Sequence, residues 1–120
     1  MQSSAAEIKI HHILEEAGIN FIEEYTFPDL KAENGKYLRF DYAVFDDDGE
    51  LLCLIEYNGR QHYVAIGKFG GQVGLYRQRH NDAAKRRYCL EHDLRLETIP
   101  FTDEEVLSYD YLMKRIYELD

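Results

Sequence analysis

The spacing of apolar residues predicts alternating helices and strands in the first half of the chain. A Ser4-x-x-Glu7 capping box precedes apolar residues at helical spacing and predicts a helix that ends at about Ala17, before Gly18. Stretches rich in aromatic and β-branched residues then predict three strands, at Phe21–Phe27, Tyr37–Phe45 and Glu50–Tyr57.

The segments between and after these strands set the expected topology. Asp46–Gly49 has the composition of a hairpin turn, so the strands on either side of it should pair antiparallel. About eighteen residues with four glycines follow Asn58-Gly59, and a loop of that length in a small domain is usually functional or disordered. The remaining elements are a predicted helix, strand and helix, at Arg77–His92, Leu94–Pro100 and from the Thr102–Glu105 cap to about Leu119. This order predicts an α/β fold with a mixed central sheet flanked by helices.

Composition limits the size and setting of the protein. With 120 residues, 14.2 kDa and 45% hydrophobic residues, we expect one globular domain over residues 1–120. No apolar run approaches the ~20 residues of a membrane-spanning helix, and the start, Met1-Gln2-Ser3-Ser4, has no basic-then-apolar signal. Cys53 and Cys89 are the only cysteines, so a disulfide framework is not expected and a reducing, cytoplasmic setting fits best.

Charge is distributed unevenly along the chain. The formal net charge of −9 opposes nucleic-acid binding when it is read as an average. Residues 60–95 nevertheless hold eight basic and three acidic residues, a net +5, while the rest of the chain carries −14. Because local potential steers a ligand, this segment could present a positive face to DNA. Its basic residues are candidate DNA contacts, or else a solvated helix surface: Arg60, Lys68, Arg77, Arg79, Arg86 and Arg87.

Two acidic residues interrupt the apolar strands. Asp41 lies within one predicted strand and Glu56 near the end of the next. Burial of an unpaired carboxylate costs several kcal/mol, so each needs a partner. A hairpin centred near Asp47 pairs Asp41 with Leu54 and places Glu56 diagonally on the same face. Two converging carboxylates suit Mg²⁺. The alternative is an ion pair with Arg39 or a nearby lysine.

A histidine and two helix residues complete the candidate chemistry. His62 follows the Asn58-Gly59 turn, where it could act as a general acid or base or have a purely structural role. Asp82 and Lys85 lie at i, i+3 on the next predicted helix and therefore share a face. Either they form an ordinary surface pair, or Asp82 fixes the tautomer of His62 while Lys85 contacts phosphate.

These residues belong to an ordered series of short motifs that spans Ser4 to Phe101. The motifs are, in order, Ser4-x-x-Glu7, Leu14-x-x-x-Gly18-Ile19, Arg39-Phe40-Asp41, Ile55-Glu56-Tyr57-Asn58-Gly59-x-Gln61-His62-Tyr63, Asp82-x-x-Lys85-x-x-Tyr88-Cys89 and Leu94-Arg95-Leu96-x-x-Ile99-Pro100. The series resembles the very-short-patch-repair-endonuclease-like branch of the PD-(D/E)XK nuclease superfamily. It also resembles phage homing endonucleases of the Glu-Asp-x-His-Asp type, which share that fold.

The resemblance implies an α-β-β-β-α-β-α restriction-endonuclease-like core and specific catalytic roles. Asp41 falls on the metal-binding aspartate and Glu56 on the second acidic position of the superfamily motif. His62 matches the active-site histidine, and Asp82 matches the helix aspartate that accompanies it. Glu7 falls on a first-helix glutamate that reaches the active site, although here it also completes the capping box.

Two positions depart from the family pattern. Phe40 precedes the aspartate in place of proline, which is common in this branch. Asn58 stands where the motif lysine is expected, and that lysine would stabilise negative charge on the phosphate. Either His62 and Lys85 take over its role, or activity is lost.

The expected function is therefore Mg²⁺-dependent hydrolysis of DNA by an endonuclease, with Mn²⁺ as a possible substitute. Asp41 and Glu56, with a backbone carbonyl near Gln61, would hold one or two metal ions. The small size favours a homodimer or an accessory DNA-binding partner, and a phage or mobile element would suit such an enzyme. One alternative is an inactive nuclease fold that binds DNA or a protein. Another is an interaction domain built on the C-terminal tyrosines, Tyr109, Tyr111 and Tyr117.

Overall fold

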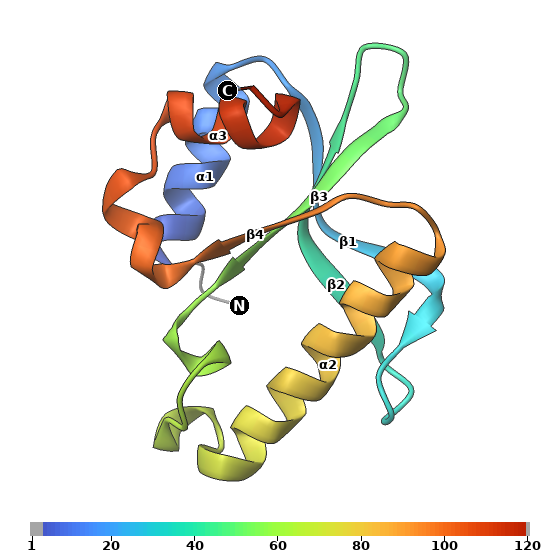
Figure 1. Cartoon of the computed structure of the whole chain (residues 1–120), viewed down its shortest axis with the longest axis vertical. Coiled ribbons are helices and arrows are strands. Elements are labelled where there is room, and N and C mark those ends of the chain that lie inside the picture. Colours follow the sequence, from blue (N-terminus) through green and yellow to red (C-terminus); the bar gives the residue numbers. More distant parts are fainter. Residues whose placement is uncertain (1–3, 120) are drawn as a thin grey trace.

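The computed structural model describes residues 4–119, which fold around one four-stranded mixed sheet (Figure 1). The strand order is β1-β2-β3-β4; β1–β2 and β2–β3 are antiparallel, and β3–β4 are parallel. The predicted mixed sheet and the β2–β3 hairpin are thus confirmed. Met1–Ser3, where no leader is expected, and Asp120 lie outside the described residues. The strands are β1 (Asn20–Lys31), β2 (Tyr37–Phe45), β3 (Leu51–Asn58) and β4 (Leu96–Pro100).

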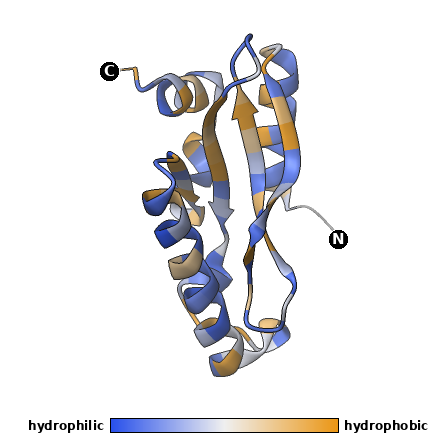
Figure 2. Cartoon of the chain, turned by 90° about the vertical axis from the view of Figure 1, so that its right-hand side faces the viewer, coloured by the Kyte–Doolittle hydropathy of each residue, from blue (hydrophilic) through white to orange (hydrophobic). Residues whose placement is uncertain are grey.

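Helices cover both faces of this sheet. α1 (Ala5–Glu16) and α3 (Tyr109–Tyr117) pack side by side on one face, and α2 (Gly71–Glu91) crosses the other (Figure 1). Ile10, Leu112 and Ile116 belong to the first core, while Tyr88 and Cys89 of α2 belong to the second. Figure 2 shows apolar residues gathered along the strands, whereas the outer turns of α2 are largely hydrophilic. The expected flanking of the sheet by helices is confirmed.

β2 changes the face that it presents to each core at Asp41. Phe40 packs in the core under α2, whereas Tyr42 packs in the core under α1 and α3. In a regular strand, residues two apart lie on the same face, so Phe40 would share a face with Tyr42 and Val44. Here Tyr42 and Val44 share one core, and Phe40 lies in the other. The partner strand is irregular at the same level: Glu23 pairs with Tyr42, Tyr25 pairs with Phe40, and Glu24 between them has a φ of 50°. The sheet therefore twists sharply where Asp41 lies.

Two predicted boundaries and one strand register in the first 91 residues are wrong. β1 continues past Pro28 to Lys31, because proline is tolerated on an edge strand. The hairpin register pairs Leu54 with Ala43, not with Asp41. α2 begins at Gly71 instead of Arg77, so the expected long loop shrinks to a segment containing two single-turn 3-10 helices, η1 (Arg60–His62) and η2 (Gly67–Phe69).

The C-terminal helix is shorter than predicted. Residues Phe101–Val106 form a 3-10 helix, η3, and α3 starts after Ser108, whose hydroxyl accepts a hydrogen bond from Tyr111 N at 3.1 Å. The acidic cap therefore belongs to η3, and Ser108 is the N-cap of α3. Val106 and Tyr117 are exposed, whereas Leu112 and Ile116 are buried in the core. Cys53 and Cys89 are both buried and free. Within residues 4–119, the helices are too short or too polar to span a membrane.

Candidate active site

The site lies at a fork where β2 and β3 separate. Their pairing runs from the turn only as far as Tyr42 and Ile55, after which β3 continues alongside β4 as far as Asn58. In Figure 1 the two strands diverge below this point and α2 lies across the opening. Asp41 occupies the fork: its Oδ2 accepts a hydrogen bond from Tyr57 N at 2.7 Å. The carboxylate thus takes the place of a strand-to-strand hydrogen bond.

Asp41 is held in an environment that disfavours its charge. Burial, followed by the charge of Glu56, raises the pKa of the Asp41 carboxyl to about 7, against the opposing effect of the Tyr57 N–H. The charge of Glu7 acts in the same direction as that of Glu56. Two acidic neighbours therefore oppose the charge of Asp41, and a cation at the fork would relieve that repulsion.

Glu7 caps the start of α1, as the sequence predicted. Its backbone N–H donates to Ser4 Oγ at 3.1 Å, and the Ser4 hydroxyl donates to Glu7 Oε1 at 3.1 Å, which caps α1. The Tyr42 hydroxyl donates to the Glu7 carbonyl oxygen at 2.8 Å and ties the start of α1 to β2 beside the fork. Glu7 is therefore a capping residue whose charge also reaches Asp41.

Glu56 forms a buried ion pair across the fold. Lys85 Nζ of α2 lies 2.9 Å from Glu56 Oε1, and the two side chains are only 11% and 6% exposed. Burial raises the pKa of Glu56, and the Lys85 ammonium opposes that shift. Arg39, the partner considered from the sequence, instead contacts Glu24 at 3.3 Å. The ion-pair interpretation is thus correct for Glu56, with Lys85 as the partner.

His62 and Asp82 form the second buried pair of the site. The short η1 turn places His62 Nδ1 2.9 Å from Asp82 Oδ2, with side-chain exposures of 9% and 12%. Burial alone would raise the pKa of Asp82, but the hydrogen bond and charge of His62 outweigh burial, and the pKa lies below its ordinary value. The expected contact between these residues is confirmed, whereas the surface pair between Asp82 and Lys85 is wrong, since Lys85 turns toward β3.

Gln78 is a site residue that the sequence analysis missed. Its Nε2 donates to Asp82 Oδ1 at 3.2 Å, so both carboxylate oxygens of Asp82 are engaged. The i, i+4 spacing of Gln78 and Asp82 on one helix was the available signal. Gln78 holds the carboxylate in the orientation that faces His62.

Asn58, which stands at the expected lysine position, has an unsatisfied oxygen. Among residues 4–119, Asn58 Oδ1 is the buried side-chain atom that has no hydrogen-bond partner. It borders a cavity of about 10 Å³ that Glu56, Asp82 and Lys85 also line. A space of that size holds about one water molecule or small ion. The amide therefore adds an oxygen acceptor, in place of a positive charge, beside the two buried pairs.

The candidate DNA contacts lie outside this buried centre and are all exposed. Arg60 lies on η1, Lys68 on η2 and the others on α2. Arg79 donates to the Tyr63 carbonyl oxygen at 3.4 Å, and Arg86 borders the small cavity with Asn58. Within the described residues none of the six is in a salt bridge, so their charge remains available to a polyanion. The set is Arg60, Lys68, Arg77, Arg79, Arg86 and Arg87.

The donor set of the fork suits a hard divalent cation in part. No group of three or more His, Cys, Asp or Glu side chains within residues 4–119 is arranged to hold a metal. Mg²⁺, however, is usually bound through one or two carboxylates, with water and substrate phosphate as the other ligands. Asp41 and Glu56 meet that requirement, and their mutual repulsion favours a cation. Lys85 competes for Glu56, so metal binding would have to loosen the ion pair.

Comparisons with known proteins identify viral relatives and no family. No protein-family model and no solved structure matches the chain. It is 32% identical over 79 residues to "Uncharacterized protein 307L" of Invertebrate iridescent virus 6 and 37% identical over 61 residues to "Uncharacterized protein 094L" of Frog virus 3 (isolate Goorha). The matched segments cover 65% and 49% of this chain. They cover 40% and 39% of those relatives, so the chain spans about two fifths of their length.

Proposed function

We propose that the protein is a Mg²⁺-dependent DNA endonuclease of the PD-(D/E)XK type, with its active site at the fork. The observation that carries the proposal is a set of charged groups from two strands, a turn and a helix that act on one another. Glu56 and Lys85 form one buried pair and influence the Asp41 carboxyl, while His62 and Asp82 form a second buried pair and influence Glu56. Clusters of buried titratable groups with raised and lowered pKa values are typical of catalytic sites. The order of the motifs and the α/β topology agree with the resemblance described above.

The acidic residues of the fork would hold the cation. Bound by Asp41 and Glu56, Mg²⁺ would neutralise charge on the scissile phosphate and lower the pKa of an attacking water. His62 contacts Asp82 through Nδ1, which would leave Nε2 to act on the substrate. Its role is to accept the proton of the attacking water or to protonate the leaving oxygen. Asp82 is a positioning residue that keeps the ring in this orientation.

Lys85 would replace the missing motif lysine. Its ammonium lies against Glu56 in the absence of substrate, and engagement of Glu56 with a cation would release it toward the phosphate. The exposed arginines of α2, Arg79 and Arg86, would bind neighbouring phosphates. So small a positive surface supplies few contacts, and we therefore propose that a second copy or an accessory protein strengthens DNA binding, or that the enzyme has low sequence specificity. Similarity to two viral proteins is consistent with action inside an infected cell.

Plasmid nicking with Mg²⁺ tests this assignment. Asp41→Ala and Glu56→Gln should each reduce the nicking rate at least about 100-fold, as expected for loss of an electrostatic stabiliser. Asp47→Ala, in the exposed turn, is the matched control and should cleave as wild type does. EDTA should abolish cleavage. Equal cleavage by wild type and Asp41→Ala would eliminate the site.

A second candidate is a nuclease fold that binds DNA without cutting it. Asn58 in place of the lysine, and the neutralisation of Glu56 by Lys85, favour this function. Calorimetric titration with Mg²⁺ or Mn²⁺ separates the two. The nuclease should bind metal, and Asp41→Asn should lose that binding. A wild type that binds DNA but neither metal would support the module.

A further inference from the structure

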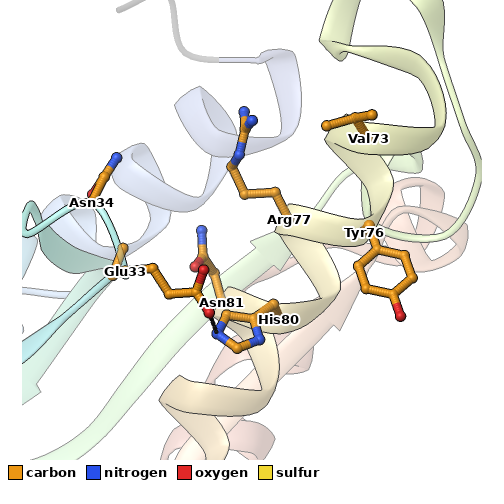
Figure 3. Close-up of a pocket in the computed structure, with 8 residues that line it drawn as sticks. Glu33, Asn34, Val73, Tyr76, Arg77, His80 and Asn81 are labelled. Carbon is orange, nitrogen blue, oxygen red and sulfur yellow. Dashed lines mark ion pairs between the residues drawn. The ribbon is translucent and has the colours of Figure 1, made fainter.

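A pocket outside the buried pairs lies between α2 and the turn that joins β1 to β2 (Figure 3). Its volume is about 390 Å³. Glu33 and Asn34 line it from the turn, and Tyr76, Arg77, His80 and Asn81 line it from the first half of α2. We propose that this pocket holds one unstacked nucleobase of the DNA substrate. The inference rests on the proposed function and names the form in which that substrate binds.

The pocket has the volume and the mixed lining of a small-ligand site. Sites for small ligands have volumes of about 300–1,000 Å³ and combine apolar walls with a few polar groups. His80 Nε2 lies 3.2 Å from Glu33 Oε1, so an ion pair connects the two walls (Figure 3). Turn and helix are thus in contact across the pocket although they are distant in the sequence.

The lining supplies each type of contact that a nucleotide requires. Tyr76 is 81% exposed at the rim, where its ring is free to stack on a base. Asn81 and Arg77 extend from α2 toward the same side in Figure 3. An asparagine amide offers one donor and one acceptor edge to a base, and a guanidinium pairs with phosphate. A purely apolar peptide would leave these polar groups unmatched.

Residues of α2 connect the pocket to the neighbourhood of the proposed active site. Arg77 and Asn81 also line a second hollow, of about 190 Å³, whose wall includes Gln61 and Gln78. Gln78 in turn donates to Asp82, the partner of His62. A strand whose phosphate contacts Arg77 could therefore place one base in the larger pocket and extend its backbone toward His62. This placement selects DNA with an unpaired base over regular duplex.

Binding of labelled oligonucleotides in EDTA tests the inference without cleavage. The probes are a short fluorescent single strand and the same strand with abasic residues. Wild type should bind the base-containing strand roughly tenfold more tightly, as expected for stacking of a base on an aromatic ring. Tyr76→Ala and Asn81→Ala should each remove most of that ratio, with abasic binding unchanged. Tyr76→Phe should keep it, as should Tyr109→Ala, which removes an exposed tyrosine of α3.

Several results would overturn the pocket assignment. They are equal binding of both probes by wild type, no binding of either, and an unchanged ratio in both alanine variants. The nicking assay keeps this proposal separate from the proposed function. Base-dependent binding without cleavage supports the pocket and opposes the nuclease. Cleavage without base-dependent binding opposes the pocket alone.

Discussion

Glu56 of β3 and Lys85 of α2 form an ion pair of 2.9 Å that is almost completely shielded from solvent. The pair connects the sheet to the helix that crosses the fork. Desolvation offsets much of the attraction in such a pair, so its net contribution to folding is small. Loss of a single partner is different, because it leaves a buried charge without compensation.

The pair predicts opposite effects of single and double substitution. Lys85→Met should lower the free energy of unfolding by about 3–5 kcal/mol, and Glu56→Gln in the same chain should restore much of it. Urea denaturation measures both. Arg39→Met, which removes an exposed pair with Glu24, should cost about 1 kcal/mol or less. A double variant as unstable as Lys85→Met would contradict the assignment.

The raised pKa of Asp41 predicts a pH dependence of stability. Between about pH 4 and pH 7 the folded chain keeps a proton that the unfolded chain has lost, so this group makes folding less favourable as the pH rises through that range. Asp41→Asn should therefore raise the Tm more at pH 8 than at pH 5. Circular dichroism in EDTA measures the difference, and Asp47→Asn should show none. Mg²⁺ at pH 8 should raise the Tm of wild type and leave Asp41→Asn unchanged.

The His62–Asp82 contact predicts a change in a neighbouring titration. In His62→Ala, burial acts on Asp82 without its main opposing partner, so the pKa of the Asp82 carboxyl should rise. Carbon-detected NMR of the carboxyl measures it. The same variant should nick DNA about 10²- to 10⁴-fold more slowly. His12→Ala, on an exposed position of α1, should change neither quantity; an unaltered Asp82 titration in His62→Ala would count against the contact.

A close backbone contact at the start of α2 predicts the behaviour of two glycines. A Cβ at Gly74 would lie 1.8 Å from the carbonyl oxygen of Phe69, so Gly74→Ala must displace η2. A Cβ at Gly67 would meet open space. Gly74→Ala should therefore lower the Tm by several degrees and speed proteolysis near η2. Gly67→Ala should stay within about 0.5 kcal/mol of wild type; equal effects of both substitutions would argue against the packing.

The sequence predicted the elements whose determinants are local. The Ser4 cap defines the start of α1, and the Asp46–Gly49 turn defines the β2–β3 hairpin. The start of α2 was missed because Gly71 and Gly74 have poor helix propensity, and the close packing of Gly74 against η2 is not encoded by local propensity.

The candidate site was predictable to a similar degree. The contact between His62 and Asp82 followed from motif order. The partner of Glu56 could not be predicted in this way. Lys85 reaches β3 because α2 packs on the sheet, and the spacing of residues along the chain does not encode that packing. The fork was missed for the same reason, since it depends on the twist at Asp41 and Glu24.

The hydrogen bond from Tyr57 N–H to Asp41 affects which residues should persist among related sequences. An aspartate or asparagine at this position keeps two diverging strands anchored, whether or not the protein cuts anything. Selection for folding alone would therefore preserve an aspartate or asparagine at this position in related proteins that have no catalytic activity. His62 anchors no pair of strands, since its buried contact with Asp82 joins a single-turn helix to α2. Loss of this histidine before loss of the aspartate is therefore the order expected in related proteins that do not cut DNA.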